Sequence, residues 1–169
     1  MNIHNALLIH AEAEILSFIK NCSHDKIDVR DELEQTPLHI AASQGFTDIV
    51  EKLIKKKANI SAVDRKGWTP LHFAAYYQNY EICEKLIGLK ADLTASTKDG
   101  STVVAYIANA KVFDPKQLKI MELALSKGVD INQPNLHGET ALSRASLTGT
   151  TQIIDFLLSK GAVVNQTNE

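Results

Sequence analysis

Apolar residues recur along the chain at helical spacing, in short runs separated by polar, glycine-containing segments. In the clearest unit, Leu71, Ala74 and Ala75 share one face of a short helix. A polar break at Gln78 and Asn79 follows. The run 80–87 then places a second apolar set on one helical face: Ile82, Cys83, Leu86 and Ile87. The pattern predicts a turn, a short helix, a reversal and a longer helix in each unit.

This unit is repeated. The segment Thr-Pro-Leu-His-Ile-Ala-Ala at residues 36–42 returns as Thr-Pro-Leu-His-Phe-Ala-Ala at residues 69–75, 33 residues later. Weaker copies begin at Thr102 and Thr140. Threonine is a good N-cap and proline suits the first helical position, so each copy marks a helix start. Because one unit is too small to bury its own apolar face, the period predicts a stack of neighbouring units in one domain, 1–169.

The repeat boundaries follow from this period. We expect an atypical N-terminal cap over 1–30, repeats over 31–63 and 64–96, a degenerate repeat over 97–134, and a C-terminal repeat over 135–169. The third repeat has extra residues near 113–117, where Asp114 and Pro115 predict a fresh helix start. Seven of the eight glycines fall at recurrent turn or helix-end positions.

The two Thr-Pro-Leu-His segments, repeated at this period, resemble those of the ankyrin-repeat family over the whole chain. The resemblance implies an all-α fold of antiparallel helix pairs stacked into a curved solenoid, with β-hairpin-like fingers along one edge. It also implies that His39 and His72 are structural, each ring bonded to the preceding threonine hydroxyl and to nearby backbone. Family members have no active site and bind other proteins through the fingertips and the concave face of the first helices.

Several positions depart from the family pattern. Glu34 replaces the turn glycine of the first full repeat. Proline and histidine are replaced by Val103 and Ala105 in the third repeat and by Ala141 and Ser143 in the fourth. We therefore expect the least regular stacking around the third repeat.

Three aromatic residues are the strongest functional signal. Trp68 lies at the predicted base of a finger, and Tyr76 and Tyr77 end the first helix of the same repeat, on its predicted concave side. Such side chains are favoured as binding hot spots; the alternative is that they pack sideways against neighbouring repeats. Tyr80 is expected to be structural. With the equivalent positions of the other repeats, the candidate partner-binding set is Leu33, Gln35, Ser43, Gln44, Arg65, Lys66, Trp68, Tyr76, Tyr77, Lys98, Asp99, Ser101, Asn109, Leu136, His137 and Glu139.

Composition narrows the range of partners. The net charge of −2 over 169 residues gives no global basic field for nucleic acid or an anionic membrane. No apolar run has the length of a spanning helix. Cys22 and Cys83 are interpreted as reduced core residues of an intracellular protein. We expect a cytoplasmic location, with the nucleus as the alternative.

Catalytic and metal sites have no support in the sequence. There is no phosphate-binding glycine loop, nucleophile motif or metal-ligand cluster. His4, His10, His24 and His137 show no ligand spacing with the two repeat histidines. We therefore expect no enzyme activity, no cofactor and no metal.

The sequence favours a non-catalytic module that binds another protein. The alternative is an inhibitor or regulatory subunit of an enzyme such as a kinase, and an enzyme or small-molecule binder is the remaining hypothesis. The helix expected at 151–159 is unusually apolar for an end repeat. Either residues 161–169 fold over it, or the natural protein continues, or this face is an interface. We expect a monomer unless this end face self-associates.

Overall fold

The structure, a computed structural model, describes residues 3–23 and 26–164, which form ten helices. His24 and the residues after Val164 lie outside this part. The chain divides into two compact units, Met1–Ala91 and Asp92–Glu169. The N-terminal unit holds α1 (Ile3–Leu8), α2 (Glu12–Asn21), α3 (Pro37–Gln44), α4 (Thr47–Lys55), α5 (Pro70–Tyr76) and α6 (Tyr80–Gly88). The C-terminal unit holds α7 (Val103–Ala108), α8 (Pro115–Ser126), α9 (Ala141–Thr148) and α10 (Thr151–Ser159). The predicted all-α fold is confirmed, and the single domain over 1–169 stays a prediction.

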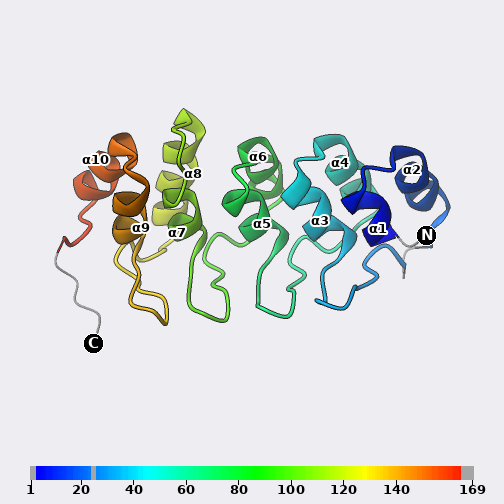
Figure 1. The fold of residues 1–169 in the computed structure, drawn as a ribbon, viewed down its shortest axis with the longest axis horizontal. Coiled ribbons are helices and arrows are strands. Elements are labelled where there is room, and N and C mark those ends of the chain that lie inside the picture. The colour runs from blue at the N-terminus through cyan, green and yellow to red at the C-terminus, as the bar shows by residue number, and fades with distance from the viewer. Residues whose placement is uncertain (1–2, 24–25, 165–169) are drawn as a thin grey trace. The chain divides into compact units, whose positions relative to one another are not determined.

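Within the N-terminal unit, three helix pairs lie in a row (Figure 1). The first helices contact one another in the order α1, α3, α5, and the second helices do so in the order α2, α4, α6. Alanines line the contact between first helices: Ala41, Ala42, Ala74 and Ala75 are each 0% exposed. Small side chains let neighbouring helices approach closely, so each pair buries its apolar face against the next pair rather than in a central core.

The C-terminal unit is built in the same way from α7 with α8 and α9 with α10, and α9 packs on α7. The extra residues of the third repeat start α8 as predicted. The Asp114 carboxylate accepts a hydrogen bond from the Lys116 backbone N–H at 2.8 Å, and the Gln117 side chain accepts one from the Asp114 N–H at 2.9 Å. This capping box fixes the helix start locally, without the Thr-Pro-Leu-His segment.

The turns use left-handed backbone where glycine was expected. The seven predicted glycines all have positive φ: Gly45, Gly67, Gly100, Gly128, Gly138, Gly149 and Gly161. At the finger position shared by Gly67, Gly100 and Gly138, the first full repeat instead has Glu34, with φ 63°. A residue with a Cβ is disfavoured in this conformation. Glu34 therefore holds a turn that glycine would adopt more easily.

Replacing Glu34 by glycine should raise the free energy of unfolding by about 0.5–1 kcal/mol. This is a net effect, because glycine relieves the left-handed strain of the folded turn but also has more conformational freedom in the unfolded chain. Urea denaturation would measure it. Glu32→Gly is the matched control, because Glu32 is also exposed but is not among the positive-φ residues of the described chain. A gain of equal size in both variants, or a loss at Glu34, would contradict the strain argument.

One core prediction is only half right. Cys83 is buried, and burial raises the pKa of its thiol to about 12. Cys22 follows the end of α2 and is half-buried. Both cysteines are free thiols, but only Cys83 belongs to the core.

Candidate functional site: an aromatic hollow

Trp68 is held at the base of a finger by its backbone. Its N–H donates to the Asp64 carboxylate at 2.8 Å. Its carbonyl oxygen accepts from the Asp64 N–H at 2.9 Å and lies 3.0 Å from Nε2 of His39 in the preceding repeat. Three hydrogen bonds therefore fix the main chain of the one tryptophan in the sequence. Because the main chain is already fixed, less conformational entropy would be lost when Trp68 contacts a partner.

An aromatic cluster surrounds Trp68. Its ring centroid lies 5.4 Å from that of Tyr76 and 5.1 Å from that of Phe73, and Tyr76 and Tyr77 are 5.1 Å apart. The Trp68–Tyr76 and Tyr76–Tyr77 pairs are edge-to-face, and the Trp68–Phe73 pair is tilted at 59°. Such contacts hold the rings in place. Tyr76 and Tyr77 nevertheless stay 44% and 53% exposed. The buried Tyr80 is structural, as expected.

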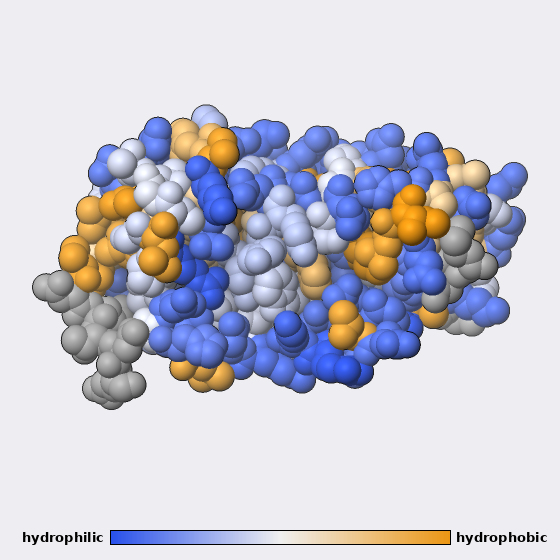
Figure 2. Space-filling model, in the orientation of Figure 1, coloured by the Kyte–Doolittle hydropathy of each residue, from blue (hydrophilic) through white to orange (hydrophobic). Residues whose placement is uncertain are grey.

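These rings line a hollow of about 310 Å³, here called the aromatic hollow. Figure 2 shows a pale region over α5, the colour of residues of intermediate hydropathy such as tryptophan and tyrosine. The lining of the aromatic hollow brings together seven of the residues expected to bind a partner, and adds two more. The predicted residues are Leu33, Gln35, Arg65, Lys66, Trp68, Tyr76 and Tyr77, and the additions are Asp64 and Phe73.

Phe73 was missed because the sequence was interpreted around the buried face of α5. Phe73, Tyr76 and Tyr77 stand at positions i, i+3 and i+4, which share one helical face. That spacing was available in the sequence. Asp64 was correctly interpreted as a turn residue: it is 5% exposed, and its carboxylate accepts the N–H groups of Lys66 and Trp68.

The other predicted residues of the N-terminal unit are less engaged. Gln44 is exposed, while Ser43 is half-buried and its hydroxyl donates to the Ile40 carbonyl oxygen at 2.9 Å. Neither lines the aromatic hollow.

In the C-terminal unit, the expectation for Ser101 is wrong. Its side chain is 1% exposed, because its hydroxyl faces Asn135 and Arg144 at 3.4 and 3.1 Å. A residue buried in this polar network offers no contact surface. The remaining predicted residues of this unit are exposed or half-exposed: Lys98, Asp99, Asn109, Leu136, His137 and Glu139. Half-exposed Glu139 forms an ion pair with Arg144 at 3.1 Å.

A sequence model described as ankyrin repeats (3 copies) matches residues 3–97 and 84–168. The chain belongs to the ankyrin-repeat family. Ankyrin repeats are generally protein–protein interaction modules. Their stacking explains why the aromatic hollow is built from two successive fingers and one first helix.

Two curated relatives are similar to this ankyrin chain. The NF-kappa-B p105 subunit of Rattus norvegicus is 30% identical over 163 residues, which are 94% of this chain and 13% of the relative. The protein of the same name from Gallus gallus is 32% identical over 71 residues, which are 39% of this chain and 7% of the relative. The chain thus spans only a small part of either relative.

The ankyrin histidines have the structural role that the family resemblance implied. The Thr36 N–H donates to Nδ1 of His39 at 3.0 Å, and the Thr36 hydroxyl lies 2.9 Å from the same nitrogen. His72 and Thr69 repeat this arrangement at 3.2 and 2.9 Å. His4 has a related role that the sequence did not reveal, since its Nε2 lies 3.0 Å from the Gln35 carbonyl oxygen. Gln35 and Trp68 occupy equivalent finger positions, so the N-terminal cap carries a third repeat histidine.

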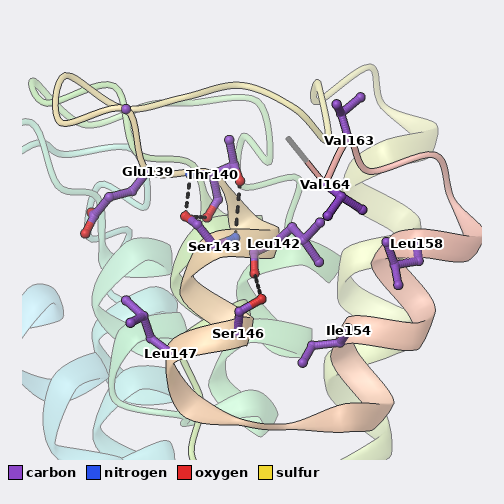
Figure 3. A pocket seen from close by; sticks show the side chains of 11 residues that line it. Glu139, Thr140, Leu142, Ser143, Ser146, Leu147, Ile154, Leu158, Val163 and Val164 are labelled. Atoms are coloured by element: carbon purple, nitrogen blue, oxygen red, sulfur yellow. Dashed lines mark hydrogen bonds between the residues drawn. The ribbon is translucent and has the colours of Figure 1, made fainter. Parts of the chain in front are cut away.

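A second hollow, of about 540 Å³, lies on the end face of the C-terminal unit. In Figure 3 its apolar side chains come from α9, from α10 and from the segment after α10. They are Leu142, Leu147, Ile154, Leu158, Val163 and Val164. At the position of Ile154, the earlier repeats have Val50, Cys83 and Met121, each 0% exposed. The apolar character expected of α10 is therefore present at the surface.

None of the helices formed by residues 3–23 and 26–164 has the length and apolar content that a membrane span requires. Within the same ranges, no three His, Cys, Asp or Glu side chains gather in a way that suits a metal ion. The aromatic hollow offers ring edges and faces for non-covalent contact.

Proposed function

We propose that this ankyrin chain binds a partner protein through the aromatic hollow, which would lie on the concave face and fingertips of the stacked repeats. The observation that carries the proposal is a tryptophan with a fixed backbone beside two exposed tyrosines in a hollow. Rigid aromatic side chains supply large contact area with little loss of entropy.

The polar rim would set specificity. Arg65 and Lys66 border the aromatic hollow. Ser43 and Gln44 would extend the contact surface within the N-terminal unit, and the C-terminal unit would contribute contacts of its own through Lys98, Asp99, Asn109, Leu136, His137 and Glu139. Residues of this kind around a few aromatic anchors match the anatomy of ordinary protein interfaces.

The double variant Trp68→Ala, Tyr77→Ala should fold but bind the partner at least about tenfold more weakly, a loss of about 1.4 kcal/mol. Partner proteins would be captured from cell extract on the wild-type chain, and their affinities for each variant measured by calorimetry. Circular dichroism would verify that the variant is folded.

The matched control is Leu89→Ala, Val112→Ala, which removes two exposed apolar side chains (46% and 70%) that do not line the aromatic hollow. The control should bind as the wild type does. Equal affinity of the wild type and the Trp68, Tyr77 variant would overturn the proposal.

A further inference from the structure

We propose that the aromatic hollow selects a partner segment in which an aromatic or aliphatic side chain stands next to an aspartate or glutamate. This inference rests on the proposed function and specifies the chemistry of the ligand. It is carried by the charges that border the hollow and by the aromatic character of its floor.

The charges that reach solvent in the lining are both positive. Three lining residues carry a formal charge: Asp64, Arg65 and Lys66. Asp64 is 5% exposed, and its carboxylate already accepts two backbone N–H groups at 2.8 Å. Arg65 and Lys66 are exposed. A partner therefore meets two cations and no free carboxylate of the lining.

Arg65 is also held in position. Its backbone N–H donates to the Leu33 carbonyl oxygen at 3.0 Å, and its guanidinium Nη2 donates to the carbonyl oxygen of Glu32. A guanidinium that uses one N–H in this way keeps further donors for a carboxylate. Because one end of the side chain is already fixed, little extra ordering is needed to bind an acidic residue.

The floor supplies the second half of the recognition. Trp68, Tyr76 and Tyr77 offer ring edges and faces for an apolar or aromatic side chain. An aromatic floor by itself also attracts cations. Arg65 and Lys66 oppose that choice, since like charges repel across the same small hollow. The lining thus favours an acidic segment over a basic one.

The acidic residue should lie on the side of Arg65 and Lys66. Glu32 and Glu34 are exposed on the neighbouring finger and do not line the hollow. The Arg65 guanidinium reaches the same finger, at the Glu32 carbonyl oxygen, and offsets part of their negative charge.

The experiment is a selection from a random peptide display library on the wild-type chain. We expect enrichment of peptides that place Asp or Glu beside Trp, Phe, Leu or a similar side chain. A synthetic selected peptide should bind Arg65→Glu, Lys66→Glu at least about tenfold more weakly, and its affinity for the wild type should fall as salt is raised. Enrichment of neutral or basic peptides, or equal binding to the charge-reversed variant, would overturn the inference.

Two controls keep the outcomes distinct. Lys55→Glu, Lys56→Glu makes the same charge change on residues that do not line the aromatic hollow and should leave affinity unchanged. If Arg65→Glu, Lys66→Glu unfolds at a much lower urea concentration than the wild type, the milder variant Arg65→Gln, Lys66→Gln takes its place. Peptides that need Trp68 and Tyr77 but not Arg65 and Lys66 refute only this inference. Peptides that bind Trp68→Ala, Tyr77→Ala as tightly as the wild type, or a library without any enriched peptide, refute the proposed function too.

Discussion

Replacing Leu71 by alanine should lower the free energy of unfolding by about 2–5 kcal/mol, whereas Leu147→Ala should change it by less than about 0.5 kcal/mol. Both leucines lie on first helices, Leu71 on α5 and Leu147 on α9. They differ in exposure, 1% against 79%. Leu71 belongs to the surface that one repeat buries against its neighbour, and its loss leaves a cavity there.

Urea denaturation followed by circular dichroism measures both changes. The expected loss at Leu71 is a large part of the stability of a small domain, about 5–15 kcal/mol, so the variant is best measured at low temperature. A loss at Leu71 as small as that at Leu147 would mean that the contact between first helices does not hold the repeats together. The same result would remove the structural basis of the aromatic hollow, whose floor is part of α5.

Helix positions could be predicted from the sequence because their signals are local. The range expected for the last helix, 151–159, is that of α10. Asp114 and Pro115 start α8 as expected, because an N-cap acts only on the next few backbone groups. The apolar period and the glycines add information of the same short range. These signals do not specify how much of each side chain the neighbouring repeats cover.

The role of His4 was missed for that reason. Its partner, the Gln35 carbonyl oxygen, is 31 residues away, and no Thr-Pro pair precedes His4 to mark it. Alignment on the left-handed residues His10 (φ 57°) and Gly45 (φ 77°) gives a spacing of 35 residues, which brings His4 onto His39. The signal existed, but only the backbone conformation makes it visible.

The candidate site was predicted in part. Trp68, Tyr76 and Tyr77 could be chosen because their repeat positions are not core positions. Ser101 occupies the same repeat position as Trp68, yet it is buried. Its environment depends on Arg144, 43 residues away, and repeat position alone cannot predict such a contact.

His39 should couple the stability of the N-terminal unit to pH. Because the Thr36 N–H donates to Nδ1, the neutral ring carries its proton on Nε2 and donates it to the Trp68 carbonyl oxygen. A second proton would have to go on Nδ1, where it would oppose the Thr36 N–H. Burial lowers the pKa of His39 below its usual 6.5, although the bond to the Trp68 carbonyl opposes part of that shift.

The direction of the pH effect follows from this depression. As the pH falls through 6.5, the unfolded chain takes up a proton at His39 while the folded chain does not. The unfolded state then binds more protons, so stability falls with decreasing pH. The stabilisation is fully present above the unfolded pKa and is lost as the pH falls toward the folded pKa.

Two substitutions separate this titration from the hydrogen bonds. His39→Ala removes the hydrogen bonds of both ring nitrogens and should lower the free energy of unfolding by about 2–4 kcal/mol at neutral pH, since each lost buried bond costs about 1–3 kcal/mol. His39→Gln keeps an acceptor for the Thr36 N–H, as Gln117 does for Asp114 in α8, but it does not titrate. It should therefore be less destabilised and should show a smaller loss of stability between about pH 7.5 and pH 5.5.

The measurement is urea denaturation across this pH range, with His137→Gln as the control at an exposed histidine. A pH dependence that is unchanged in His39→Gln, or reduced equally in His137→Gln, would show that His39 is not the group responsible. Because His39 also holds the carbonyl oxygen of Trp68, His39→Ala should weaken partner binding under conditions where the chain is still folded. The hydrogen bond between His39 and this carbonyl oxygen joins two repeats and also positions the aromatic side chain proposed to bind the partner, so its loss should lower both stability and affinity.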